Sequence, residues 1–224
     1  MSTFVVNVAP EPGTASLLRP GLGTPLAVGT LSGVANVSPT PAPRGPNVRV
    51  RSLGEERFQF YIEGSLAPGW AGNLASGLAA QRISIERGEA HAERGGVWTA
   101  RFEVQRLAGA LPFEAIDLAK LASTDSGEGF ATPLRLIGFE LAASAERGGC
   151  LVVAVSAQDT VGFLAALLRR LSFFSLFPIE MRLETRGGRV DDVLWLRGAG
   201  DRAPSLRAQE ALRRALAVHE AEHT

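Results

Sequence analysis

The C-terminal end of the chain carries two histidines at the spacing of a zinc-binding motif. His219-Glu220-Ala221-Glu222-His223 matches the HExxH pattern, which on a helix puts both imidazoles on one face beside a glutamate. A catalytic zinc needs a third protein ligand downstream, and only Thr224 follows in this sequence. A chain terminus also frays, whereas such sites lie in buried helices. We therefore expect a solvated tail here and no metal site.

The other candidate groups do not assemble into a catalytic set. Asp191 and Asp192 are neighbours in a predicted strand, so their side chains point to opposite faces and cannot serve one site. We expect them to lie on a solvated face. His91 is predicted on a strand, and Cys150 is a lone thiol in an apolar run. We expect no enzyme and no cofactor.

Two Gly-x-Gly stretches could be considered as parts of a phosphate-binding loop. They are Gly21-Leu22-Gly23 and Gly198-Ala199-Gly200. Neither completes a phosphate-binding fingerprint leading from a strand into a helix. Both are predicted to be turns.

Two further glycines, Gly69 and Gly162, stand directly before predicted helices. A helix start offers unpaired N–H groups that attract carboxylate or phosphate. A glycine there lets a ligand come close to the backbone. Asp159 lies just before the second of these helices, where it could cap the helix or contact a ligand. The two turns are the candidate binding sites.

The elements around Gly162 follow the order strand, helix, strand, hairpin, strand. Predicted strands cover residues 150–156, 178–185 and 189–196, and a second helix covers 205–218. One face of the first helix carries Phe163, Leu164, Leu167, Leu168 and Leu171. A strand–helix–strand unit predicts a parallel pairing with a right-handed crossover, and Gly187-Gly188 predicts an antiparallel hairpin. The fold class is therefore α+β, a two-layer ferredoxin-like sandwich.

Two stretches of this unit resemble ACT domains. Asp159-Thr160-Val161-Gly162-Phe163-Leu164 is similar to the Asp-Arg-Pro-Gly-Leu-Leu turn of that family, with Thr160 and Val161 in place of arginine and proline. Val190-Asp191-Asp192-Val193-Leu194-Trp195-Leu196 resembles the family's strand after the hairpin, Val-x-Asp-Val-Phe-Tyr-Val. The resemblance is closest to the C-terminal ACT repeats of PII uridylyltransferases.

In ACT domains this turn holds the main chain of an amino acid, often between two paired domains. The resemblance thus implies a ligand site at Asp159, Thr160, Val161, Gly162, Phe163, Leu164, Pro68, Gly69 and Trp70. The first turn carries Leu66 where the second has Asp159. Trp70 could fill the core or the pocket. The first turn is therefore expected to bind ligand more weakly than the second, or only to pair with it.

The first half of the chain repeats the second. Gly69 matches Gly162 at an offset of 93 (162 − 69), and Arg94-Gly95-Gly96 matches Arg186-Gly187-Gly188 at 92 (186 − 94). Two markers agreeing to within one residue over a domain length indicate a repeat. Each copy is a β-α-β-β-α unit with a fourth strand supplied from its N-terminal side, by residues 47–53 and 134–141. Residues 111–122 are predicted to be the second helix of the first copy.

The predicted domains are a Pro/Gly-rich arm (1–46), a first ACT-like domain (47–123), a linker (124–133) and a second ACT-like domain (134–224). The arm's composition does not bury a core. Within it, residues 3–8 could add an edge strand, and the arm could be flexible or packed along the first domain. Each copy is small, so the two are expected to stabilise each other across a shared surface.

The composition of the chain limits which kinds of partner it can bind. The chain has 224 residues, 23 Lys plus Arg and 23 Asp plus Glu, hence no net charge. That argues against nucleic-acid or anionic-membrane partners bound by bulk charge. No apolar run approaches the ~20 residues of a membrane span, and no signal peptide is recognisable. A cytoplasmic location is expected.

These features predict a small-molecule sensor or regulator that binds an amino acid. The alternative is a ligand-free interaction or dimerisation module, serving a homodimer or a regulated partner protein. The absence of a catalytic set favours both over an enzyme.

Overall fold

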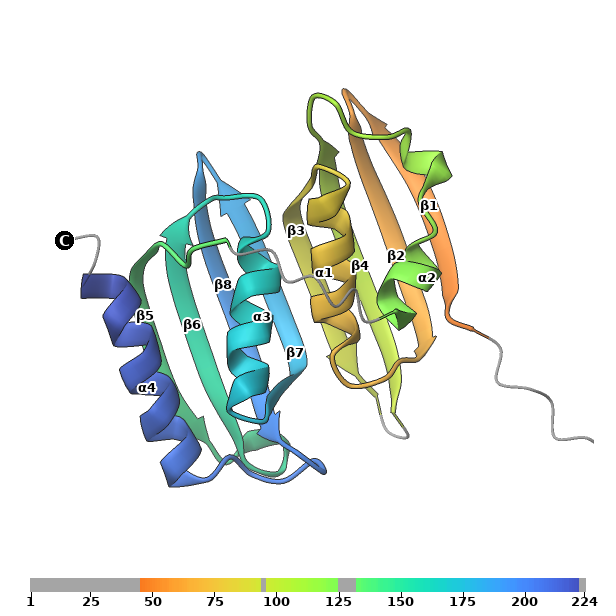
Figure 1. The fold of residues 1–224 in the computed structure, drawn as a ribbon. Coiled ribbons are helices and arrows are strands. Elements are labelled where there is room, and N and C mark those ends of the chain that lie inside the picture. The colour runs from red at the N-terminus through yellow and green to blue at the C-terminus, as the bar shows by residue number, and fades with distance from the viewer. Residues whose placement is uncertain (1–44, 94–95, 125–131, 222–224) are drawn as a thin grey trace, which may run out of the picture. The chain divides into compact units, whose positions relative to one another are not determined.

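The computed structural model describes residues 45–93, 96–124 and 132–221. Four α-helices and eight strands lie within these ranges (Figure 1). In chain order they are β1 (Asn47–Gly54), β2 (Arg57–Ser65), α1 (Trp70–Ala80), β3 (Ile83–Ala92), β4 (Val97–Arg106), α2 (Leu118–Ser123), β5 (Leu136–Ser144), β6 (Cys150–Gln158), α3 (Phe163–Phe173), β7 (Leu176–Arg186), β8 (Arg189–Gly198) and α4 (Leu206–Ala221). The arm, with its predicted strand at 3–8, and the turn at 21–23 lie outside the described residues.

The second copy has the predicted ferredoxin-like order, with one correction to its strand pairing. β6 and β7 are not paired, because β8 returns from the hairpin and lies between them. Every neighbouring pair in the sheet is therefore antiparallel. Gly187 and Gly188 both have positive φ (58° and 77°), as a two-residue hairpin turn requires. β5 supplies the fourth strand from the N-terminal side, as predicted.

The first copy repeats this arrangement in detail. β1 pairs with β2 from the N-terminal side, and β4 lies between β2 and β3. β3 and β7 carry a register shift at matching places, between Ile85 and Arg87 and between Pro178 and Glu180. The fold is thus two ferredoxin-like units in tandem, and the predicted α+β class is confirmed. In each copy the helices cover one face of the sheet (Figure 1).

The predicted helix over residues 111–122 is wrong in extent. Only a single 3₁₀ turn at Phe113–Ala115 and the six-residue α2 form there. Ile116 is extended (φ −94°, ψ 119°) and breaks the run. The helix restarts at Leu118, after Asp117, whose side chain accepts a 2.9 Å hydrogen bond from the Lys120 amide. A local cap therefore overrides the continuous apolar pattern.

We expect Asp117→Ala to destabilise the protein by about 1 kcal/mol, because the variant loses that cap. Urea unfolding would measure the change. The matched control is Glu114→Ala, an exposed acid three residues earlier, which should change stability by less than about 0.5 kcal/mol. Equal losses from both variants would mean that the Asp117 cap does not stabilise α2.

The two copies join into one eight-stranded sheet with the order β1-β2-β4-β3-β7-β8-β6-β5. β3 pairs with β7 over five residues, from Arg87 opposite Glu184 to His91 opposite Glu180. This pairing brings α1 and α3 against each other above the sheet. One apolar core consequently runs through both copies, with Phe60, Phe102, Leu167, Leu171 and Leu194 among its buried members. The two copies therefore share a surface, as expected, and their mutual stabilisation stays a prediction.

Across the described residues, no helix combines the length and the apolar composition that crossing a bilayer requires.

Candidate functional site

The two predicted turns have nearly the same backbone geometry. Gly69 (φ 89°, ψ −7°) and Gly162 (φ 88°, ψ 2°) each stand immediately before a helix in the left-handed conformation. In both turns the first helical amide donates back to a carbonyl three residues earlier: Trp70 to Ala67 at 3.1 Å, and Phe163 to Thr160 at 2.9 Å. The repeat predicted from the glycines therefore exists in the backbone.

Asp159 does not cap α3, so the first of the two roles considered for it is wrong. The helix starts after Gly162, three residues later, and no side chain caps it. The glycine turn has replaced a side-chain cap with a backbone hydrogen bond. Asp159 is partly buried instead, and its amide donates to the Gly188 carbonyl at 2.9 Å.

The second turn faces a small cavity of about 40 Å³, here named the second-turn cavity. Five of the six predicted residues of this turn line it. The exception is Val161, which is 36% exposed and whose carbonyl accepts a hydrogen bond from the Thr132 hydroxyl. The cavity's lining residues are Ala75, Ala79, Ile83, Ser84, Ile85, Asp159, Thr160, Gly162, Phe163, Leu164, Ala165, Leu183, Thr185, Val190 and Asp192. The opposite wall thus comes from α1 and β3 of the first copy.

Two carboxyl groups lie at the second-turn cavity, and both have a raised pKa. Asp192 is only 4% exposed; burial raises its pKa to about 7, although an amide hydrogen bond from Glu184 opposes the shift. Burial, followed by the charge of Glu86, raises the pKa of Asp159. Both Asp191 and Asp192 were predicted to lie on a solvated face. The prediction is correct for Asp191 and wrong for Asp192, because adjacent residues of a strand face opposite sides of the sheet.

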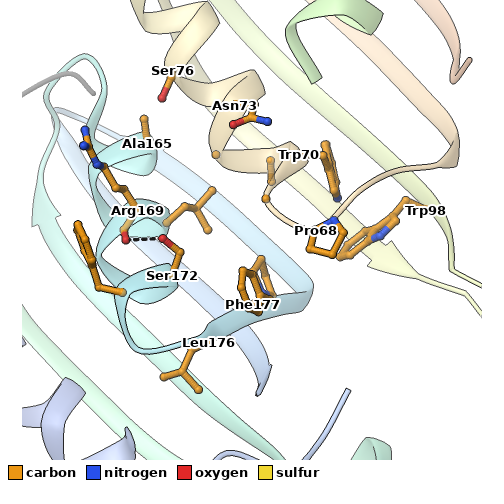
Figure 2. Close-up of a pocket in the computed structure, with 16 residues that line it drawn as sticks. Pro68, Trp70, Asn73, Ser76, Trp98, Ala165, Arg169, Ser172, Leu176 and Phe177 are labelled. Carbon is orange, nitrogen blue, oxygen red and sulfur yellow. Dashed lines mark hydrogen bonds between the residues drawn. The ribbon is translucent and has the colours of Figure 1, made fainter. Parts of the chain in front are cut away.

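The first turn faces a much larger cavity of about 500 Å³, here named the junction cavity. Its lining residues are Pro68, Gly69, Trp70, Ala71, Gly72, Asn73, Ser76, Trp98, Ala165, Leu168, Arg169, Ser172, Phe173, Leu176, Phe177 and Pro178. Figure 2 shows Pro68, Trp70 and Trp98 on one side, with Ser172, Leu176 and Phe177 on the other. The cavity thus lies where the first turn meets α3 and the start of β7.

Trp70 serves both roles considered for it. It is 2% exposed and stacks edge-on against Trp98, with ring centroids 5.3 Å apart. It also reaches Phe102 in the core at 6.4 Å. The indole therefore anchors α1 to the sheet while one side of it borders the cavity.

The size difference between the cavities has a simple origin in the repeat. Ala71 and Gly72 of the first copy stand where the second copy has Leu164 and Ala165. Ala71 and Gly72 border the junction cavity, Leu164 borders the second-turn cavity and Ala165 borders both, so smaller side chains accompany the larger cavity at the first turn. This substitution was visible in the aligned copies. The contribution of Arg169, Ser172 and Phe177 was not, because it depends on the β3–β7 pairing.

The HExxH pattern falls at the end of α4. Glu222 and His223 lie outside the described residues, so its solvated-tail interpretation stays a prediction. Among the residues that the structure does describe, no group of three His, Cys, Asp or Glu side chains could hold a metal ion.

No protein-family model matches the chain. No curated protein matches it either. A crystal structure of aspartate kinase from Synechocystis is similar at 15% sequence identity and a TM-score of 0.42, over 72% of this chain. The matched part is 27% of the length of that enzyme.

Proposed function

We propose that this chain is a regulatory protein that senses a small molecule, held in the junction cavity between its two ACT-like copies. The observation that carries the proposal is the cavity at the Gly69 turn. Its volume of about 500 Å³ lies within the usual range of small-molecule sites. Most of its lining residues are apolar or aromatic, and four of them are polar or charged.

The lining favours binding over catalysis. It offers neutral polar groups from Asn73, Ser76 and Ser172 and one cation, Arg169. No carboxylate, imidazole or thiol is among these lining residues, so no general acid–base pair is at hand. A molecule here would touch both copies. Its binding energy would therefore bias how α1 and α3 pack, which is how a ligand regulates.

The ligand class that this site suggests first is an amino acid or a close chemical relative. The α1 start presents amides that a helix leaves without intrahelical acceptors, and these suit a carboxylate. The experiment is isothermal titration of the purified chain with the amino acids and their related acids. A ligand present at 100 times its Kd should also raise the unfolding free energy by about 2.7 kcal/mol. If no compound binds at millimolar concentration, the proposal is wrong.

A ligand-free interaction module remains the second candidate, and one observation favours it. Phe173 borders the junction cavity and is 72% exposed, so its ring adds to the apolar lining as surface that a partner protein could cover. A homodimer or a regulated partner protein would cover it. Light scattering and a pull-down, with and without Phe173→Ser, would separate this candidate from a monomeric sensor.

A further inference from the structure

The two cavities differ in volume and in whether acidic residues line them. The second-turn cavity has Asp159 and Asp192 but only about 40 Å³, which is space for a few water molecules at most. The junction cavity has about 500 Å³ and no aspartate or glutamate in its lining. A ligand large enough to need the junction cavity therefore meets no anion there.

The first copy has apolar core residues at the positions of the two acids, and neither of these residues lines the junction cavity. Asp159 corresponds to Leu66, and Asp192 corresponds to Ala100. Leu66 is 8% exposed and Ala100 is 1% exposed, so both belong to the core. An ammonium group leaving water needs a paired anion or a full set of hydrogen-bond acceptors. The first copy offers apolar side chains at both matching positions.

The charged and hydrogen-bonding groups that line the junction cavity favour a negatively charged ligand. Arg169 is the one charged residue in the lining, and it makes no ion pair with any residue that the structure describes. Its side chain is exposed and so reaches the solvent side of the cavity. The first-turn amides of Ala71 and Gly72 add donors. A cationic group would be repelled by this set.

The apolar part of the cavity favours a ring. Trp70 and Trp98 meet edge-on at 5.3 Å, and Phe177 lies across the cavity from them (Figure 2). Aromatic walls of this kind pack well against another ring.

We infer that the junction cavity takes an aromatic carboxylic acid without an α-ammonium group, in preference to the matching amino acid. This inference rests on the proposed function and narrows its ligand class. The acid's carboxylate faces the α1 start and Arg169, and its ring lies among Trp70, Trp98 and Phe177.

The test compares 3-phenylpropionate with L-phenylalanine, which share a ring and a carboxylate and differ by the ammonium. The full chain carries Trp195→Phe, so that Trp70 and Trp98 report binding by fluorescence, and calorimetry confirms the affinities. We expect 3-phenylpropionate to bind at least tenfold more tightly. 3-Phenylpropanamide, which lacks the charge, should bind more weakly than the acid.

Arg169→Gln should weaken 3-phenylpropionate binding three- to tenfold and leave the amide unaffected. The matched control is Arg207→Gln, an exposed arginine on α4, which should change neither. Tighter binding of phenylalanine, or equal binding of both, would overturn this inference while leaving the proposed function standing. If neither probe binds, and if none of the amino acids and related acids in the wider titration binds, both this inference and the proposed function are wrong.

Discussion

The stability of the protein is expected to decrease as the pH rises from about 4 to about 7, and Asp192→Asn should abolish most of that decrease. The Asp192 carboxyl is buried, and its pKa is raised from 3.8 to about 7 in the folded state. A group with a raised folded pKa binds its proton more tightly when folded. Its stabilising effect is therefore complete below pH 4 and is lost as the pH rises through 7.

The size of this effect follows from the shift. About three pH units at 1.36 kcal/mol each give a loss of at most about 4 kcal/mol between the two limits. Asparagine keeps an oxygen that accepts the Glu184 amide hydrogen bond, found at 3.1 Å in the parent chain. It has no proton to lose, so the variant should match the parent near pH 4 and exceed it near pH 8. Urea unfolding across this pH range is the measurement.

Asp191→Asn is the control for that experiment. Asp191 is the adjacent acid on the exposed face, and hydrogen bonds from Ser156 and Arg189 lower its pKa. A lowered folded pKa gives stability that is present above the unfolded pKa and is lost as the pH falls. The control should therefore keep the decrease between pH 4 and 7. Parallel stability curves for the parent and Asp192→Asn would show that the carboxyl is already charged in the fold.

The fold was largely predictable because each element occurs in both copies and could be identified from either sequence. Gly69 and Gly162 marked equivalent helix starts, and the alternation of apolar residues marked the strands. The pairing of β6 with β7 was misjudged because a crossover fixes strand direction and not adjacency. The hairpin strand β8 takes the place between them. The short α2 was misjudged because Asp117 is an effective cap inside an apolar stretch.

The candidate site was only partly predictable, since each cavity is built by both copies. The residues of the two turns could be named from motif and repeat. Which of the two turns has the larger cavity could not be predicted, because the volume of each cavity depends on the side chains that the other copy places opposite the turn. The sequence placed the acid Asp159 at the second turn and so favoured that turn. The structure places the larger cavity at the first turn, where Ala71 and Gly72 make room.

Gly69→Ala should weaken binding of the junction-cavity ligand by tenfold to hundredfold, whereas Gly162→Ala should change its affinity less than twofold. Both glycines have the same φ, 89° and 88°, so alanine strains both turns alike and costs about 1 kcal/mol or more of stability in each. Only Gly69 borders the large cavity. A methyl group there keeps a carboxylate from the α1 amides, and each charge-assisted hydrogen bond lost costs about 1.5–3 kcal/mol.

The pair controls for folding, because the equal backbone strain cancels between the two variants. Unfolding free energies and ligand affinities are measured on both, with 3-phenylpropionate and L-phenylalanine as probes. Matching stability losses with a selective loss of affinity at Gly69 place the ligand at the first turn. If Gly162→Ala lost affinity equally, both turns would contact ligand. If it alone lost affinity, the site would be the second turn, and its cavity would have to open beyond the present 40 Å³ for a molecule to enter.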